Sequence, residues 1–295
     1  MTKTLRMIVK GGLGNQLFQY FAGRELSDET ERKLVLDLSW YRRNVHKNGL
    51  LNQRNFMLNQ YKFAETCTTS DEFVWRNAPL VERVIKRLPN QIGNSFGFFH
   101  EPTIDDLNRV VQQQVVTFGH WVQNPILPIK STLRQLLLDG ITNPSNSYLD
   151  LIEEQSQINV ISLHHRLGDY KNFSSIYEIK DEKYFLAGSR LISNRIKGAA
   201  PEIWLFSDEP DISYSLLSKS IPISRVVNSQ AQLNEAETIS LMARSKGIVA
   251  SNSTFSWWAS YLSDESNTSI VFPKNYMKNI LIQNSGLYVD GWDYL

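Results

Sequence analysis

Residues 159–170 read NVISLHHRLGDY, an apolar run that ends in two histidines and an arginine. The apolar run predicts a buried strand. Because side chains alternate along a strand, we expect His164 and Arg166 on one face and His165 on the other. Strands and helices alternate through the residues that follow, which is typical of βαβ units and a parallel sheet. His164 and Arg166 therefore stand at the carboxyl end of a parallel strand, where α/β proteins bind ligands.

The chain as a whole is predicted to be an α/β protein with parallel sheets. In the second half we expect strands at 159–163, 203–206, 223–227, 248–250 and 269–272, and helices at 183–197, 210–219, 234–247 and 254–262. Asn234, with Glu237 three residues later, matches the capping box of a helix start. The first half is less regular. It predicts strands at 5–10 and 33–37 and a helix after Gly14, whereas 40–114 shows little pattern.

Composition bounds the function classes. The 295 residues include 31 Lys and Arg and 30 Asp and Glu, a net charge of +1. This balance argues against a dedicated nucleic-acid-binding protein, which would be strongly basic. The single cysteine, Cys67, excludes a disulfide framework within the chain. The N-terminus lacks the pattern of a signal peptide, and no apolar run approaches the ~20 residues of a membrane span. We therefore expect a cytoplasmic protein.

The length suggests about two domains, at roughly 150 residues each. The stretch 142–147 reads TNPSNS, and this turn-rich composition is typical of a linker. We therefore predict an N-terminal domain at 1–145 and a C-terminal domain at 146–295.

A glycine-rich loop, GGLGN at 11–15, follows the first predicted strand and precedes a helix. Glycine permits close backbone approach to a ligand, and a helix N-terminus attracts anions. The loop is not a dinucleotide fingerprint, because the third glycine would fall on Leu17, and no Gly-Lys-Ser/Thr of a P-loop follows. The composition of this loop fits a structural turn and a ligand-binding loop equally well.

Two further segments follow predicted strands. Residues 251–256, SNSTFS, open a helix with several hydroxyls, which is either an anion site or an ordinary N-cap. Asp208 and Glu209 are either ligand-binding carboxylates or an acidic helix start before Pro210. The chain has no Asp-x-Asp pair to hold a divalent cation. The charge of a diphosphate would therefore have to be met by Arg166 and helix dipoles.

Four segments, in this order, resemble the bacterial α1,2-fucosyltransferases of glycosyltransferase family 11. They are GGLGNQLFQY at 11–20, HHRLGDY at 164–170, FSDE at 206–209 and STFSWW at 253–258. The resemblance implies a GT-B-like fold of two Rossmann-like halves, with the donor site mainly in the C-terminal half. It also implies GDP-β-L-fucose as the donor and a terminal galactose as the acceptor, with inversion at the anomeric carbon and neither metal nor cofactor.

Residue roles follow from the same resemblance. Arg166 would stabilise the leaving diphosphate, and Asn15 would face the reacting centre. The residues implied to bind the donor are Gly12, Gly14, His164, Arg166, Asp208, Glu209, Ser253, Thr254 and Phe255, with Asp208 or Glu209 reading guanine. Asp169 and Asp37 are candidates for the base because each follows a predicted strand, although Asp169 also fits a turn cap. The family usually has two consecutive arginines, and here the second is Leu167.

The acceptor is less defined than the donor. A galactose-terminated, lipid-linked glycan of a surface polysaccharide would bring the enzyme to the inner membrane face. Trp40, Tyr41, Trp75 and Trp121 are either sugar-stacking or core residues. The alternatives are transfer of another GDP-sugar and a nucleotide-sugar-binding protein without transfer activity. A nicotinamide-dependent oxidoreductase is disfavoured by Leu17.

Overall fold

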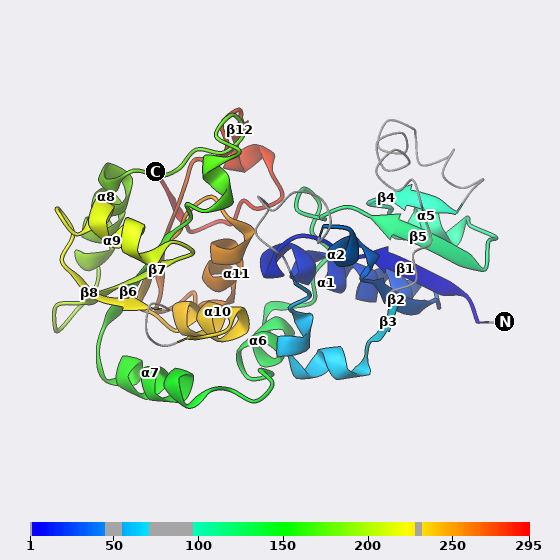
Figure 1. The fold of residues 1–295 in the computed structure, drawn as a ribbon, viewed down its shortest axis with the longest axis horizontal. Helices are drawn as coiled ribbons and strands as arrows, with labels where there is room; N and C mark the ends of the chain where they lie inside the picture. Colours follow the sequence, from blue (N-terminus) through cyan, green and yellow to red (C-terminus); the bar gives the residue numbers. More distant parts are fainter. Residues whose placement is uncertain (1, 45–54, 71–96, 228–231) are drawn as a thin grey trace. The chain divides into compact units, whose positions relative to one another are not determined.

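The computed structural model of the chain, shown in Figure 1, describes residues 2–44, 55–70, 97–227 and 232–295. The chain divides into two compact units, Met1–Thr132 and Leu133–Leu295. Each unit contains one parallel sheet with packed helices, so the predicted α/β class with two Rossmann-like halves is confirmed.

Unit 1 is built on a five-stranded parallel sheet with the order β3-β2-β1-β5-β4. Helix α1 packs on β1 and β2. The strands are β1 (Thr4–Ile8), β2 (Lys33–Asp37), β3 (Thr68–Ser70), β4 (Phe98–His100) and β5 (Gln114–Phe118), and the helices are α1 (Leu13–Glu29), α2 (Ser39–Asn44) and α5 (Ile104–Asn108).

Strand β1 lies between β2 and β5, and this position marks the switch point of unit 1. The chain adds β2 and β3 on one side of β1 and then places β5 and β4 on the other. Open α/β sheets bind ligands outside the carboxyl ends of the two strands at such a reversal. The loops after β1 and β5 are therefore the expected ligand-binding loops of unit 1.

Unit 2 is built on a six-stranded parallel sheet with the order β13-β10-β9-β6-β7-β8, together with the β11–β12 hairpin. Its strands are β6 (Val160–His165), β7 (Glu202–Ser207), β8 (Ile223–Val227), β9 (Gly247–Val249), β10 (Ser269–Phe272), β11 (Asn275–Met277), β12 (Ile280–Leu281) and β13 (Asp293–Tyr294). Its helices are α6 (Lys130–Leu138), α7 (Asn146–Gln157), α8 (Glu182–Ser193), α9 (Pro210–Leu217), α10 (Glu235–Ala243) and α11 (Thr254–Leu262), the first residues of α6 belonging to unit 1.

Helices cover both faces of the second sheet. Helices α8 and α9 pack on one face, and α7, α10 and α11 lie on the other (Figure 1). Apolar side chains of β6 and β7 face α8, including Leu163 and Leu205, which are fully buried with Phe185 and Ile192 of that helix. Burying one such side chain contributes about 1.5–3 kcal/mol, so this layer fixes β6 firmly.

The switch point of unit 2 lies between β6 and β9. The chain adds β7 and β8 on one side of β6 and then places β9, β10 and β13 on the other. The segments that follow β6 and β9 begin at Arg166 and Ala250. The motif after β6 and the serine-rich start of α11 therefore meet at one edge of the sheet.

The elements predicted in the second half are confirmed, with end points that differ by a few residues. The capping box of α10 is present, because the side chain of Asn234 accepts from the backbone of Glu237, and that of Glu237 accepts from the backbone of Asn234. Helix α8 ends earlier than expected, at Ser193. The sequence pattern did not predict α5, α6 or α7, the short strands β3 and β4, β5, or β11, β12 and β13.

The boundary between the units lies within α6, at 132/133, rather than at the predicted 145/146. Contacts of α6 with unit 2 explain the difference. Leu133 and Leu137 are fully buried, Arg134 donates to the carbonyl of Leu262, and Arg244 donates to the carbonyl of Leu138 at 3.4 Å. The predicted linker leads directly into α7.

Within the residues that the structure describes, no helix is both long and apolar enough to cross a membrane.

Candidate functional site

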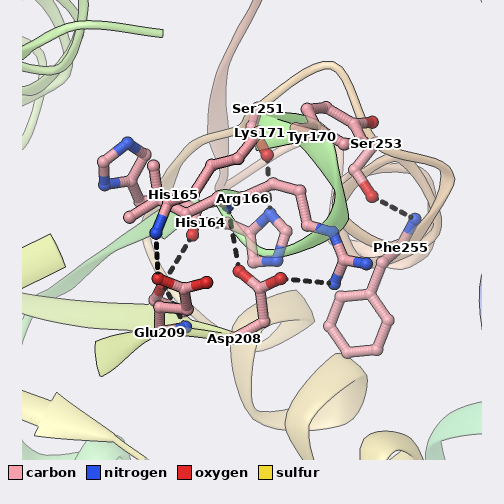
Figure 2. Close-up of polar contacts among 12 residues, drawn as sticks. His164, His165, Arg166, Tyr170, Lys171, Asp208, Glu209, Ser251, Ser253 and Phe255 are labelled. Atoms are coloured by element: carbon pink, nitrogen blue, oxygen red, sulfur yellow. Dashed lines mark hydrogen bonds and ion pairs between the residues drawn. The ribbon is translucent and has the colours of Figure 1, made fainter. Parts of the chain in front are cut away.

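His164 is the penultimate residue of β6 and contacts the segment that leads into α11. Its Nδ1 lies 2.9 Å from the hydroxyl of Ser251, and its ring stacks on Phe255 with the centroids 5.4 Å apart (Figure 2). Burial, together with the smaller effects of the charges on Arg166 and His165, lowers the pKa of His164 to about 3. The imidazole is therefore neutral at neutral pH, with one nitrogen as donor and the other as acceptor.

Arg166 lies on the same face as His164, as predicted. Its Nη1 is 3.1 Å from Oδ2 of Asp208, and its guanidinium lies 5.9 Å from the ring centroid of Tyr170. The other carboxylate oxygen of Asp208 accepts from the backbone N–H of Leu167 at 3.0 Å. Both side chains of the ion pair are about one-fifth exposed, at 18% and 21%. Asp208 therefore holds a permanent cation at the edge of the sheet.

Tyr170 ties this segment to the loop after β9. Its hydroxyl donates to the carbonyl of Asn252 at 2.7 Å, and its ring stacks on Tyr177 with the centroids 4.3 Å apart. The side chain of Asn252 donates in turn to the carbonyl of Tyr276. Its Oδ1 is buried and makes no hydrogen bond. The segments after β6 and β9 thus form one braced surface.

Helix α11 begins at that surface. Ser253 is its N-cap and accepts from the backbone N–H of Phe255 at 3.3 Å. Ser256 donates back to the carbonyl of Ser251 at 2.9 Å, which closes the first turn. Thr254 and Phe255 are only partly buried. The amides of a helix start carry partial positive charge, so this turn adds to the anion-binding capacity of Arg166.

His165 points away from the others, as the strand alternation predicts (Figure 2). Its ring packs edge-on against Phe185, and burial lowers its pKa to about 4, with Asp208 acting in the opposite direction. Neither ring nitrogen forms a hydrogen bond of ordinary geometry, although the Lys180 backbone lies close enough to act on its pKa. Leu167 is also buried, at 2% exposed.

Glu209 forms a second ion pair beside Asp208, with Lys171 as its partner (Figure 2). The two carboxylates predicted to read guanine therefore each hold a cation from the segment after β6. Their guanine-reading role stays a prediction. What the structure gives is a positioning role for Asp208 on Arg166.

The two candidate bases have different outcomes. The side chain of Asp169 lies outside the described part of the structure, so its role stays a prediction. Asp37 is buried, its Oδ2 lies 3.1 Å from Nη1 of Arg6, and its Oδ1 accepts from the backbone of Ser39 at 2.9 Å. A buried carboxylate with these partners braces β2 against β1. These contacts show a structural role for Asp37, and its role as a base stays a prediction.

The glycine-rich loop lies in unit 1, after β1. Gly11 has φ +84°, and a Cβ there would lie 2.8 Å from the amide of Asn15. The carbonyl of Gly11 accepts from Tyr41 at 3.2 Å and from Gln16 at 3.0 Å. Gly12 is the N-cap of α1, and Gly14 lies in its first turn. Asn15 is partly exposed and folds back over Gly11, so the loop presents Asn15 in a defined position.

The aromatic candidates for sugar stacking lie in different environments. Trp121 is 1% exposed and belongs to the core of unit 1, so it cannot stack on a sugar. Trp40 and Tyr41 are partly exposed and pack edge to face at 5.1 Å. Trp75 lies outside the described residues. Trp257 and Trp258 are buried, as expected for core residues.

Sequence reasoning missed a second loop at the switch point of unit 1. After β5 the chain continues as Gly119, His120 and Trp121, and His120 lies 3.3 Å from the side chain of Gln19 in α1. The available signal was a glycine directly after an apolar strand, as in the loop after β1. The short strands around it hid that pattern.

The comparisons with known proteins identify the family of the chain. The model of glycosyl transferase family 11 matches residues 118–295, which is more than half of the chain. The chain belongs to glycosyl transferase family 11. Its membership, predicted from the four motifs, is confirmed, and the protein is a glycosyltransferase.

Two curated relatives from Escherichia coli match most of the chain. An α-1,2-colitosyltransferase is 29% identical over 85% of this chain and 85% of its own length. The O-antigen biosynthesis glycosyltransferase WbnK is 27% identical over 96% of this chain and 98% of its own length.

The solved structure of the fucosyltransferase NodZ from Bradyrhizobium has a TM-score of 0.54, with 13% identity, 89% of this chain covered and 94% of NodZ. At that identity the likeness concerns the fold alone. It confirms the predicted GT-B architecture.

No group of three His, Cys, Asp or Glu side chains that could hold a metal gathers in the described ranges. Whether transfer needs a metal is decided by experiment, and metal independence stays a prediction.

Proposed function

We propose that this family 11 enzyme transfers L-fucose from GDP-β-L-fucose to the 2-hydroxyl of a terminal galactose, with inversion and without a metal. The product would be an α1,2-linked fucosyl-galactose in an O-antigen or another surface polysaccharide. The observation that carries the donor assignment is Arg166, held by Asp208 beside the first turn of α11. A guanidinium and a helix start together suit a diphosphate.

The remaining contacts fit a nucleoside next to that diphosphate. His164 is neutral and buried, and its stack on Phe255 offers an aromatic surface beside Arg166. Hydroxyls of Ser253 and Thr254 lie at the same helix start. We assign these residues to the donor, together with Asp208 and Glu209. Gly12, Gly14 and Asn15 of unit 1 are proposed to approach the reacting centre.

The proposed reaction is a single displacement. The 2-hydroxyl oxygen of galactose forms a bond to C1 of fucose, and the bond from C1 to the β-phosphate oxygen breaks. The bonding electron pair leaves with GDP, and the hydroxyl proton passes to a base, for which Asp169 remains the candidate. Arg166 and the amides of α11 would stabilise the charge that develops on the leaving oxygen. Preorganised donors of this kind contribute several kcal/mol to catalysis.

GDP-colitose is the second candidate donor. A relative that is 29% identical over 85% of this chain is an α-1,2-colitosyltransferase. Colitose is L-fucose without its 3-hydroxyl, so both donors present the same GDP to Arg166 and α11. The two functions differ in one hydroxyl of the transferred sugar. They share the linkage and the leaving group.

The deciding experiment incubates the purified chain with lactose and either GDP-fucose or GDP-colitose, in EDTA and in Mg²⁺, and determines the product linkage. We expect an α1,2-linked fucosyl product at similar rates in EDTA and Mg²⁺. Faster turnover of GDP-colitose than of GDP-fucose would make GDP-colitose the proposed donor. GDP binding without product from either donor would favour a nucleotide-sugar-binding protein. Activity only with Mg²⁺ would contradict metal independence.

A lipid-linked acceptor would require contact with the cytoplasmic face of the inner membrane. Three apolar side chains of unit 2, Phe173, Ile176 and Leu281, are 40%, 44% and 50% exposed. Their segments run side by side, because the N–H of Lys278 donates to the carbonyl of Ile176 at 2.9 Å. Lys274 and Lys278 are exposed in the same region. Apolar side chains flanked by lysines suit an anionic bilayer surface.

Sedimentation with phosphatidylglycerol vesicles tests this contact. We expect binding to these vesicles, weaker binding to phosphatidylcholine vesicles, and loss of binding in Leu281→Asp. Equal recovery of wild type and variant in the supernatant would remove the membrane contact from the proposal and leave the reaction unaffected.

A further inference from the structure

Unit 2 contains a cavity of about 400 Å³ that is lined by none of the residues proposed to bind the donor. The segment before α8, the first turns of that helix and the segment after β10 form its walls. Sites for small molecules typically have about 300–1,000 Å³. The cavity is therefore large enough for a ligand, and the side chains around it indicate the chemistry of that ligand.

Lys180 is the most deeply placed charge at this cavity. Its side chain is 9% exposed, and lysine is rarely buried so far without a partner. Its Nζ lies 2.8 Å from Oε2 of Glu178 and 5.6 Å from the ring centroid of Tyr184. An ammonium group has three N–H donors, and Glu178 is its one hydrogen-bond partner among the residues that the structure describes. Donors therefore remain for a ligand in the cavity that Lys180 lines.

Tyr184 gives the cavity a fixed aromatic wall. Its hydroxyl donates to the carbonyl of Ala250 at 2.6 Å, which anchors the ring to the end of β9, whereas the residue as a whole is partly exposed. Ile179 and Ala187 add apolar surface to the same cavity. A ring held in this way suits stacking on the apolar face of a sugar, because little conformational freedom is lost on binding.

The side-chain charges around the cavity balance. Lys180 and Lys274 are positive, and Glu178 and Asp181 are negative. The start of α8 is already capped, because Asp181 accepts from the backbone N–H of Tyr184 at 3.0 Å. Ammonium groups donate hydrogen bonds and carboxylates accept them, so this set suits hydroxyl groups, which do both. The cavity therefore fits an uncharged, hydroxylated ligand better than a phosphate.

The cavity adjoins two regions to which the proposed function assigns a role. Lys274 lines it and lies in the region proposed to contact the membrane, and Glu178 follows Ile176 of that region by two residues. Tyr184 contacts Ala250, which begins the segment that leads into α11 and the proposed donor site. A glycan that extends from a lipid at the membrane toward the donor would therefore pass near this cavity.

We propose that the cavity binds an inner sugar of the acceptor glycan, with Tyr184 stacking on its ring and Lys180 and Glu178 hydrogen-bonded to its hydroxyls. The inference rests on the proposed function and narrows the acceptor to an oligosaccharide. The sugar in the cavity does not react, so it is bound equally in the ground state and in the transition state. Binding of this kind lowers the KM for the acceptor and leaves kcat unchanged.

Two neutral acceptors test the cavity. Methyl β-galactoside contains only the target sugar, whereas lacto-N-neotetraose carries further sugars behind its terminal galactose. With GDP-fucose as donor, or GDP-colitose if that is the donor used, the wild type should have an about tenfold lower KM for the tetrasaccharide, the value of one hydrogen bond to a charged group. The kcat values should be similar. Equal KM values for the two acceptors would overturn the inference.

Two variants and a control assign this difference to the cavity. Ala187→Trp fills the cavity from an exposed position of α8, and Lys180→Met removes the ammonium group but keeps an unbranched side chain. Each should raise the KM for the tetrasaccharide about tenfold, by the same bond count, and leave the KM for methyl β-galactoside and for the donor unchanged. Arg190→Trp is the matched control, because Arg190 is exposed on α8 and does not line the cavity. Its KM values should equal those of wild type.

Direct binding separates this inference from the proposed function. Saturation-transfer NMR of lacto-N-neotetraose with the wild type, without a donor, should show contacts of the inner sugars that weaken in both cavity variants and persist in Arg190→Trp. If the wild type transfers neither fucose nor colitose, the proposed function fails, and binding with this pattern would still support the cavity as a glycan site.

Three results would overturn the inference and leave the proposed function standing. The first is an active wild type whose two cavity variants both keep the tetrasaccharide KM. The second is an equal rise of the KM for both acceptors in both variants, which would assign the residues to the structure of unit 2. The third is inorganic phosphate that raises the tetrasaccharide KM in the wild type but not in Ala187→Trp, which would assign the cavity to an anion.

Discussion

Each unit has its first strand at the switch point of its sheet, and the two switch points carry different chemistry. In unit 2 the loops after β6 and β9 present a permanent cation, Arg166, with an ion-pair partner and a helix start. In unit 1 the loops after β1 and β5 carry the amide of Asn15 and the imidazole of His120. Two parallel sheets thus end in edges whose side chains differ in chemistry, and the permanent cation makes the edge of unit 2 the better fit for an anion.

The two edges are also made rigid by different means. In unit 2, side chains stack and cap: His164 on Phe255, Tyr170 on Tyr177, and Ser253 at the start of α11. In unit 1, the backbone takes left-handed conformations and the buried amide of Gln19 ties the two loops together. The two edges should therefore be sensitive to different substitutions.

The largest effect is expected at the charged edge. Arg166→Ala removes the cation that would stabilise the leaving diphosphate, so kcat/KM should fall by roughly 10²–10³, as for other preorganised donors. Steady-state kinetics with varied donor measure it. Arg195→Ala is the matched control. Arg195 also belongs to unit 2 and also forms an ion pair with an aspartate, but its partner Asp293 lies on the edge strand β13. We expect the kcat/KM of the control to stay near that of wild type. An equal loss of kcat/KM in both variants would contradict a specific role for Arg166.

A smaller effect is expected from Asp208→Asn. Asparagine keeps an oxygen for the N–H of Leu167 but loses the ion pair with Arg166. Losing a charge-assisted contact on a partly exposed pair should lower kcat about tenfold, near the lower end of such interactions. The preference for GDP over IDP, which lacks the 2-amino group, should be unchanged. Loss of that preference would assign Asp208 to guanine reading instead.

The smallest effect concerns the two buried histidines of β6. Their folded pKa values, about 3 for His164 and about 4 for His165, lie below the ordinary value of about 6.5. Below pH ~6.5 the unfolded state therefore binds more protons, so the free energy of unfolding should fall with decreasing pH until the folded histidines titrate. Each histidine contributes at most about 1.4 kcal/mol per pH unit in this window.

His165→Leu should remove part of that slope, because it replaces a buried titratable ring that packs on Phe185 with an apolar side chain. Urea unfolding between pH 7 and roughly pH 4.5 measures the slope, within the window set by the depressed pKa values. A variant as acid-sensitive as wild type would show that His165 is already protonated in the folded state.

The second half was predictable because its signals are local. The apolar run before His164, the Asn234–Glu237 capping box and Ser253 as an N-cap each depend on a few adjacent residues. The residues of unit 2 that we propose to bind the donor could be named for the same reason, since each follows a strand whose pattern is clear. The facing of His165 and Leu167 into the core followed from alternation alone.

The first half was less predictable because its decisive contacts are distant in sequence. Asp37 looked available until its partner Arg6, 31 residues away, was placed beside it. The contact between His120 and Gln19 joins residues 101 positions apart, and it depends on the strand order that places β5 next to β1. Strand β4 has three residues, too few for a period of two to be visible. This edge is created by the pairing of strands that are distant in the sequence, rather than by a local sequence pattern.

Helix α6 has a consequence for recombining such enzymes. Its buried leucines and Arg134 belong to unit 2, although its first residues precede the division at 132/133. A chimera that joins unit 1 of one relative to unit 2 of another should therefore be spliced before Lys130, so that the whole helix travels with its packing partners. A splice in the turn-rich stretch at 142–147 would separate α6 from Leu262 and Arg244.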